Sequence, residues 1–242
     1  MTAHGGLTSI DGGATAHSPV RPAGRLCSVD AGCERVPGAL EFVVLVGGDR
    51  AGDPSAFGAL REDAHVLSSD QALLGPGQEL IARLHRELDT RVLPGLGATY
   101  SPDFVAALLQ TAVIHLRDRL TQVNAGRPVV VDSYYYKMLA QCRLSGVTDN
   151  PMFDWWRTFP QPTRVFYLDI PPEKAWRRGY GCGLGPLSYY GTRPTRDGFI
   201  AYQKDLRELV FAELGSLDVR VLDGTADVAD TVREVRAEFL RR

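Results

Sequence analysis

A glycine-rich segment, Val46–Ser55 (VGGDRAGDPS), holds the residue types and spacing most suggestive of chemistry. It follows the apolar run Glu41–Val46 and precedes a segment that favours a helix. A turn between strand and helix binds phosphate when it reads G-x-x-x-x-G-K-[ST], because backbone amides and the lysine bind phosphate oxygens and the hydroxyl binds Mg²⁺. Gly47 and Gly52 have the separation that this pattern requires. The segment therefore predicts a phosphate-binding loop.

The two residues after the second glycine depart from this pattern. Asp53 stands where the lysine is expected, and Pro54 stands where the hydroxyl is expected. One unit charge at 4 Å is worth about 4 kcal/mol at an effective dielectric constant of 20, so Asp53 should weaken phosphate binding by several kcal/mol. Pro54 offers neither a hydroxyl nor an N–H. Ser55 lies one position late, and its hydroxyl replaces the missing one only if the loop shifts.

Polar residues also follow two other predicted strands. Asp132 and Ser133 come directly after the run Pro128–Val131, and Lys137 follows one turn of predicted helix later. Arg177 and Arg178 end the short helix predicted after a further strand. Ligands of open parallel sheets bind at the carboxyl ends of the strands, so these side chains are candidates for one site. Lys137 is one of only three lysines in the chain.

The elements that position these residues alternate between strands and helices, which predicts an α/β fold with a parallel sheet flanked by helices. Continuous apolar or β-branched runs typical of buried parallel strands predict five strands. The expected strands are 41–46, 65–68, 128–132, 163–169 and 219–222, and the expected helices are 54–60, 77–93, 101–124, 134–144, 172–178, 196–214 and 228–239, with a mobile loop at 179–195.

Composition limits the classes of function. The chain has 242 residues and a net charge of −2, which argues against a dedicated nucleic-acid-binding protein. There is no apolar run long enough to span a membrane and no apolar leader, so we expect a cytoplasmic protein. Residues 1–39 are rich in glycine without apolar periodicity and predict a disordered tail before a single domain over 40–242. The scattered cysteines do not suggest disulfides.

Four segments together resemble the thymidylate kinase family of nucleoside monophosphate kinases. Asp49–Gly52 (DRAG) matches part of its loop, and Gly126–Tyr134 (GRPVVVDSY) is similar to its G-x-x-V-V-x-D-R-Y segment. Tyr167–Arg178 (YLDIPPEKAWRR) and Val221–Thr225 (VLDGT) are similar to a later strand-to-helix segment and to the last strand. The resemblance covers residues 40–242 and implies a P-loop NTPase-type three-layer sandwich with a degenerate P-loop.

The resemblance also implies roles for individual residues. Arg50 stands where the family has a catalytic arginine, and Asp132 stands where a carboxylate could position a metal-bound water. Ser133 replaces the arginine that holds the acceptor phosphate, a role that Lys137 could fill. The candidate catalytic residues are thus Arg50, Asp132 and Arg178; the candidate cofactor-binding residues are Gly47, Gly48, Gly52, Asp53 and Ser55; and the candidate substrate-binding residues are Asp49, Ser133, Tyr134, Lys137 and Arg177, with no metal ligand assigned.

Three hypotheses remain open on the sequence alone. The first is a thymidylate-kinase-like protein that is defective in ATP-dependent phosphotransfer, a pseudokinase that binds a nucleotide or a related small molecule. The second is an active nucleoside or nucleotide kinase in which Arg50 or Lys137 replaces the missing lysine. The third is an ATP-independent enzyme that uses the acceptor pocket. ATP and Mg²⁺ are expected as cofactors only under the second hypothesis. The protein could form a homodimer, or a heterodimer with an active paralogue.

Overall fold

The computed structural model describes residues 41–51, 54–70, 72–123, 126–179 and 184–240, all within the compact unit Gly38–Arg242. The predicted tail over 1–39 lies outside the described residues, as do Gly52 and Asp53 of the glycine-rich segment. Within the described ranges, no helix is long and apolar enough to cross a membrane.

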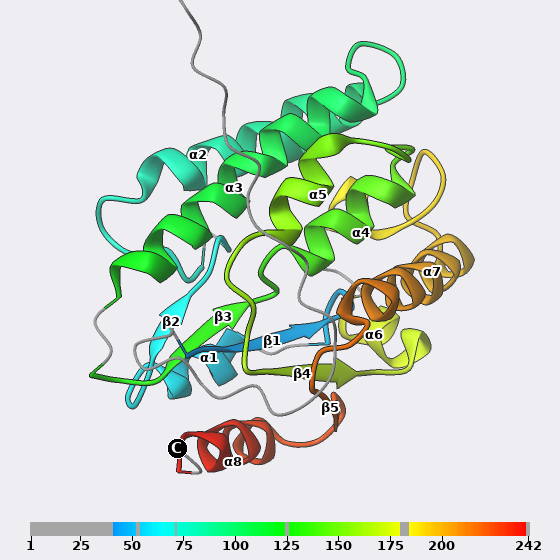
Figure 1. Cartoon of the computed structure of the whole chain (residues 1–242). Coiled ribbons are helices and arrows are strands. Elements are labelled where there is room, and N and C mark those ends of the chain that lie inside the picture. Colours follow the sequence, from blue (N-terminus) through cyan, green and yellow to red (C-terminus); the bar gives the residue numbers. More distant parts are fainter. Residues whose placement is uncertain (1–40, 52–53, 71, 124–125, 180–183, 241–242) are drawn as a thin grey trace, which may run out of the picture. The chain divides into compact units, whose positions relative to one another are not determined.

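Five parallel strands form one sheet in the order β2-β3-β1-β4-β5 (Figure 1). Val44 of the central strand pairs with Val131 of β3 on one side and with Val165 of β4 on the other. The predicted parallel sheet is therefore confirmed. The strands are β1 (Val43–Gly47), β2 (His65–Leu67), β3 (Val129–Asp132), β4 (Arg164–Asp169) and β5 (Val219–Asp223).

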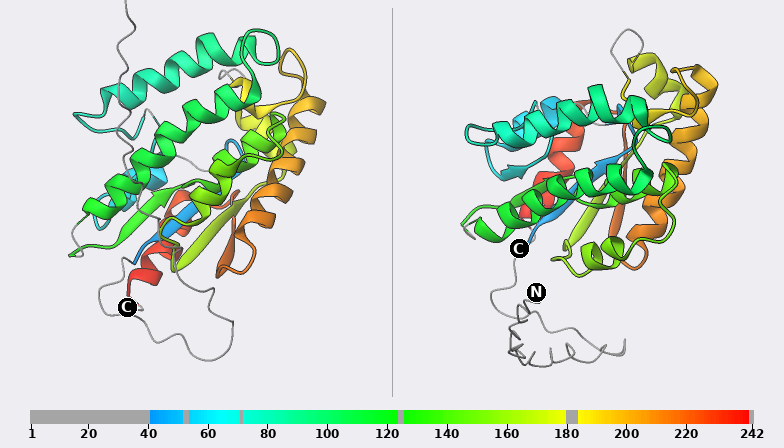
Figure 2. Two further views of the ribbon diagram at one scale, coloured as in Figure 1. Left: turned by 45° about the horizontal axis from the view of Figure 1, so that its top comes forward. Right: turned by 90° about the horizontal axis from the view of Figure 1, so that it is seen from above.

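Each face of the sheet is covered by its own layer of helices, because successive side chains of a strand point to opposite faces. Val44 and Val46 of β1 belong to the core shared with α3, α4, α5 and α7. Val43 and Leu45 belong to the core shared with α1 and α8, and Figure 2 shows α3 and α8 on opposite faces. The helices are α1 (Pro54–Leu60), α2 (Glu79–Glu87), α3 (Pro102–Gln122), α4 (Tyr136–Leu144), α5 (Pro151–Arg157), α6 (Pro172–Gly179), α7 (Arg196–Leu214) and α8 (Val228–Phe239).

The two long helices begin at side-chain caps. The Ser101 hydroxyl accepts a hydrogen bond from the Phe104 N–H at 3.1 Å, and Pro102 occupies the first helical position of α3, as the sequence predicts. The Thr195 hydroxyl accepts from the Gly198 N–H at 3.1 Å at the start of α7. A Cβ on Gly198 would lie only 2.5 Å from the Tyr190 carbonyl oxygen, so this position requires glycine.

The structure corrects the sequence interpretation at three places in the secondary structure. The helix predicted over 77–93 is shorter, and continues as a π-helical turn (Leu88–Val92) and a 3₁₀ turn (Leu93–Gly95). Pro94 lacks the N–H that a longer α-helix would need. The sequence interpretation does not include α5, a helix of 7 residues. The loop predicted over 179–195 contains a 3₁₀ turn, Pro186–Ser188.

Candidate functional site

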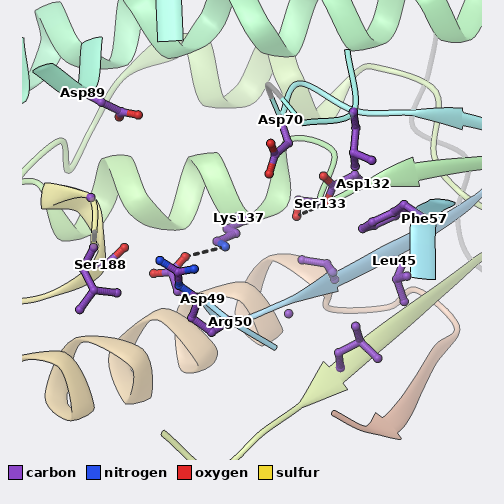
Figure 3. Close-up of a pocket in the computed structure, with 17 residues that line it drawn as sticks. Leu45, Asp49, Arg50, Phe57, Asp70, Asp89, Asp132, Ser133, Lys137 and Ser188 are labelled. Atoms are coloured by element: carbon purple, nitrogen blue, oxygen red, sulfur yellow. Dashed lines mark hydrogen bonds and ion pairs between the residues drawn. The ribbon is translucent and has the colours of Figure 1, made fainter. Parts of the chain in front are cut away.

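A cavity of about 500 Å³ lies at the carboxyl ends of β1 and β3 (Figure 3). Its walls come from the turn after β1, the start of α4, the segments after β2 and α2, and the 3₁₀ turn Pro186–Ser188. This is where a ligand of an open parallel sheet is expected. We call it the acceptor cavity, and its charged lining residues are Asp49, Arg50, Asp70, Asp89, Asp132 and Lys137.

Asp49 is the most strongly tethered side chain of the acceptor cavity. Its carboxylate forms an ion pair with the Lys137 ammonium at 2.7 Å and accepts a hydrogen bond from Gln203 Nε2 at 2.8 Å. Gln203 Oε1 accepts the Asp49 N–H at 2.8 Å, so one amide holds both the side chain and the backbone of the loop. Burial acts to raise the pKa of Asp49, but Lys137 outweighs it and holds that pKa below its ordinary value.

The turn between β3 and α4 sets the direction of two side chains. Ser133 and Tyr134 both adopt left-handed backbone conformations, with φ of 55° and 47°. The Ser133 N–H donates to the Leu45 carbonyl at 2.9 Å, and the Ser133 side chain lines the acceptor cavity. Tyr134 is fully buried in the core and does not line that cavity. Since α4 begins at Tyr136, the expectation that Ser133 and Lys137 share one helix is wrong.

Asp132 has the environment of a candidate acid or base. Its carboxylate accepts hydrogen bonds from Ser68 Oγ at 2.7 Å and from Ser133 Oγ at 2.9 Å. Burial raises the pKa of Asp132 above its ordinary value, although both hydrogen bonds and the Lys137 charge oppose the shift. A carboxyl group that is held in place at a strand end, and retains a proton more readily than usual, can exchange protons with a bound hydroxyl.

The acceptor cavity carries more negative than positive charge. Among its described lining residues there are four carboxylates and two cationic side chains, and one of those cations, Lys137, is already paired with Asp49. Asp70 and Asp89 were not singled out from the sequence. Asp70 follows β2 and could have been found by inspecting the end of that strand. Asp89 lies in the π-helical turn, and Gln203 is 154 residues from its partner, so neither gives a local sequence signal.

A second cavity of about 510 Å³ lies between the loop after β1 and the start of α8. Arg50 lines both this cavity and the acceptor cavity. Arg178 lines only the second cavity, and its guanidinium donates to the Gly224 carbonyl at 2.8 Å and the Arg50 carbonyl at 3.4 Å. Asp227 is the one acidic residue among the described lining residues. The two cavities therefore differ in charge, and Arg50 lies where they meet.

The remaining candidate residues fall into two groups. Gly47 and Gly48 line the acceptor cavity, and Cβ atoms on them would lie 2.8 Å from the Leu168 carbonyl oxygen and 2.9 Å from Gln203 Oε1. The backbone contact requires glycine at position 47, whereas the contact at Gly48 is with the end of a flexible side chain. Ser55 and Arg177 line neither the acceptor cavity nor the second cavity.

The aromatic residues near α5 do not cover the acceptor cavity. Trp156 is fully buried and Phe159 nearly so, whereas Trp155 is 42% exposed. The Arg117 guanidinium lies over the rings of Trp155 and Phe159, at 5.5 and 4.8 Å from their centroids. Arg117 is not among the residues that line the acceptor cavity.

The residues present fit ATP and Mg²⁺ poorly. Asp53 and Pro54 lack the lysine charge and the hydroxyl that hold phosphate and metal in a phosphate-binding loop. Ser55 does not line the acceptor cavity and so does not bring a hydroxyl to it. Among the described residues, no group of three or more histidine, cysteine or acidic side chains is arranged to hold a metal ion.

Solved structures of deoxyadenosine kinase from M. mycoides share this fold. The complex with bound dATP matches with a TM-score of 0.53 and 13% identity over 82% of this chain and 98% of that one. The complex with the products dCMP and a flexible dCDP matches with a TM-score of 0.51 and 12% identity, over 83% and 99%. No family model and no curated protein sequence matches the chain.

The sheet order, the flanking helices and these similar structures define the class of fold. The chain has a P-loop NTPase α/β fold in the form found in a nucleoside kinase. The identity is low, so the likeness extends to the fold alone.

Proposed function

We propose that this protein is a kinase-fold protein that binds a nucleoside-like small molecule in the acceptor cavity and does not transfer phosphate from ATP. Within the thymidylate-kinase-like group suggested by its motifs, it would be a pseudokinase. The observation that carries this proposal is the ion pair between Asp49 and Lys137. The loop sequence lacks its own lysine, and the lysine nearest to the loop is held by a carboxylate of that loop.

The charge of the acceptor cavity favours a ligand without a phosphate group. A phosphate near the four carboxylates is repelled, and Ser133 offers a hydrogen bond but no positive charge. The carboxylates of Asp49 and Asp132 instead suit the hydroxyl groups of a sugar, since ionised carboxylates accept hydrogen bonds.

A smaller recess next to the acceptor cavity would provide apolar contacts for the ligand. It has a volume of about 200 Å³ and shares Asp89, Gly185 and Ser188 with the acceptor cavity. Apolar side chains form much of its wall, and the polar side chains among its described lining residues are His85, Asp89, Gln141 and Ser188. A flat ring could occupy this recess while its sugar lies between the carboxylates, as most ligand pockets combine apolar walls with a few polar groups. The apolar lining residues are Leu88, Leu109, Met138 and Leu187.

Calorimetric titration tests the proposal directly. The purified chain is titrated with deoxyadenosine, thymidine, dTMP and ATP–Mg²⁺ in separate experiments, and each ligand is then incubated with ATP to detect product. We expect one or more nucleosides to bind, dTMP to bind at least tenfold more weakly, and ATP to be left unconsumed. Phosphorylated product from the natural chain would overturn the loss of phosphotransfer, and failure of all nucleosides would overturn the ligand class.

One observation favours an active kinase as the second candidate. Arg50 lines both cavities, so its guanidinium could neutralise a phosphoryl group passing between them. The double variant Asp53→Lys with Pro54→Ser separates the two candidates. A pseudokinase gains activity only in the double variant, whereas an active kinase turns over ATP without the changes and loses turnover in Arg50→Gln.

A further inference from the structure

A further cavity lies on the α2 and α3 side of β2. It is distinct from the acceptor cavity, the second cavity and the apolar recess. Its volume is about 150 Å³. A water molecule takes about 30 Å³ of liquid, so the space corresponds to roughly five waters and accommodates a small polyatomic ion. The polar side chains that line it are Arg61, Ser68, Gln78, His115 and Arg119.

The lining of this cavity is basic. Two arginines contribute to it, and no aspartate or glutamate does so among the described residues. Burial lowers the pKa of His115, and the nearby Arg119 charge acts in the same direction, so the ring adds no charge at neutral pH. The Gln78 amide lies 2.9 Å from His115 Nε2 and holds that ring in place. The charge of the cavity is thus opposite in sign to that of the acceptor cavity.

The two guanidinium groups retain hydrogen-bonding capacity. The Arg119 side chain forms no hydrogen bond or ion pair with any other described residue. The Arg61 side chain donates to the Leu73 carbonyl, which uses one of its five N–H donors. By contrast, some other arginines are paired with carboxylates, as Arg207 is with Asp169 at 3.0 Å. Guanidinium groups bind the oxygens of phosphate and sulfate through paired hydrogen bonds.

We propose that this cavity is a binding site for a tetrahedral oxyanion, either free phosphate or sulfate or the phosphate group of a small ligand. Arg61, which follows the last residue of α1, and Arg119 of α3 supply the charge and the N–H donors. The site does not depend on the function proposed above, because it shares no charged residue with either of the larger cavities.

Two contacts connect the oxyanion site to the acceptor cavity. Ser68 lines the oxyanion site, and its hydroxyl donates to the Asp132 carboxylate at 2.7 Å. Leu73 lines both cavities, and its carbonyl is the group that Arg61 holds. An ion that draws Arg61 toward itself therefore acts on a wall of the acceptor cavity. Binding at the two sites should then be coupled, and the coupling must be reciprocal.

Calorimetric titration with inorganic phosphate, at constant ionic strength set by sodium chloride, tests the site. We expect saturable binding by the natural chain and at least a tenfold loss of affinity in Arg119→Gln and in Arg61→Gln. Arg83→Gln is the matched control, since Arg83 is an exposed arginine of α2 that does not line the cavity. Methyl phosphate in place of phosphate distinguishes the sources: equal affinity indicates a phosphate group on a ligand, and weaker binding indicates the free ion.

Three results would overturn the proposal. The first is phosphate that binds no better than chloride to the natural chain. The second is unchanged affinity in both Arg119→Gln and Arg61→Gln. The third is a loss of phosphate affinity in Arg178→Gln but not in Arg61→Gln or Arg119→Gln, which would place the ion in the second cavity. Circular dichroism of each variant checks folding, and Arg119→Gln should fold normally because its side chain is exposed and has no described partner.

Discussion

At the scale of single residues, the ion pair of Asp49 and Lys137 is both a structural contact and a functional constraint. Their side chains are only 14% and 19% exposed, so removing one partner leaves a poorly solvated charge. We expect Lys137→Met to reduce the free energy of unfolding at pH 7 by about 3 kcal/mol. Urea denaturation measures the change, and Lys204→Met, at an exposed position of α7, is the control. An equal decrease in the free energy of unfolding in both variants would show that the ion pair does not stabilise the fold.

The same pair gives a pH dependence with a defined sign. Burial acts to raise the folded-state pKa of Asp49, but the Lys137 charge and the hydrogen bonds to the carboxylate bring that pKa below its ordinary value of 3.8, so the stabilisation is present above that pH. It is lost as the pH falls through the folded-state pKa. The difference in stability between the natural chain and Lys137→Met should therefore shrink in strongly acidic buffer. A difference that stays constant from pH 7 to pH 2 would contradict the assignment.

Asp132 should behave in the opposite way, because burial raises its folded-state pKa. The folded state then binds a proton more tightly than the unfolded state, so ionised Asp132 destabilises the fold at neutral pH. We expect Asp132→Asn to raise the melting temperature at pH 7 and to lose that advantage as the pH falls through the folded-state pKa. Asp103→Asn, at the exposed start of α3, is the control for a general charge effect. A lower melting temperature for Asp132→Asn at pH 7 would contradict the prediction.

At the scale of elements, the short helix α5 is held by contacts from distant parts of the chain. Glu213 of α7 accepts two hydrogen bonds from Arg157 of α5, at 3.0 and 2.8 Å, and pairs with Arg143 of α4 at 3.2 Å. The Glu213 side chain is 7% exposed, while both arginines are partly solvated. We expect Glu213→Ala to cost about 2 kcal/mol, between the values for surface and buried pairs. Chemical denaturation measures the free energy of unfolding of Glu213→Ala, with Glu208→Ala as the control. Equal decreases in the two variants would contradict a stabilising role of Glu213 for α5.

These elements show what the sequence could and could not predict. The strands were predictable because continuous apolar runs such as Val43–Val46 occur only where both faces are buried. The start of α3 was predictable from Ser101 and Pro102. In contrast, α5 has only the local signal of Asn150 and Pro151, and its stability depends on partners far along the chain.

The candidate site was predictable only in part, for the same reason. The positions after β1 and β3 follow from the general placement of ligands in parallel sheets. The ion pair of Asp49 with Lys137 and the contribution of Gln203 depend on how α4 and α7 pack against the loop. The excess negative charge arises when Asp70 and Asp89 approach from separate connections. Asp70 is marked only by its position after β2, and no local signal marks Asp89.

At the scale of the whole described unit, charge is distributed unevenly among its cavities. Among the described lining residues, the acceptor cavity has an excess of carboxylates, whereas the second cavity has an excess of arginines. A field of this kind selects ligands by sign, because each cavity repels the group that the other attracts. A phosphorylated ligand should therefore be excluded from the acceptor cavity by the composition of its walls.

Ser133→Arg provides the test at this scale. Ser133 lines the acceptor cavity and stands where the thymidylate kinase pattern has an arginine, so the substitution adds a positive charge and up to five donors. The left-handed backbone, at a φ of 55°, is already occupied by a residue with a side chain, so the added strain is small. We expect the affinity for dTMP to rise at least tenfold while that for thymidine changes little, as measured by calorimetry. Ser133→Gln, which adds length without charge, is the control. If it strengthens dTMP binding as much as Ser133→Arg does, then size rather than charge governs the selectivity of this cavity.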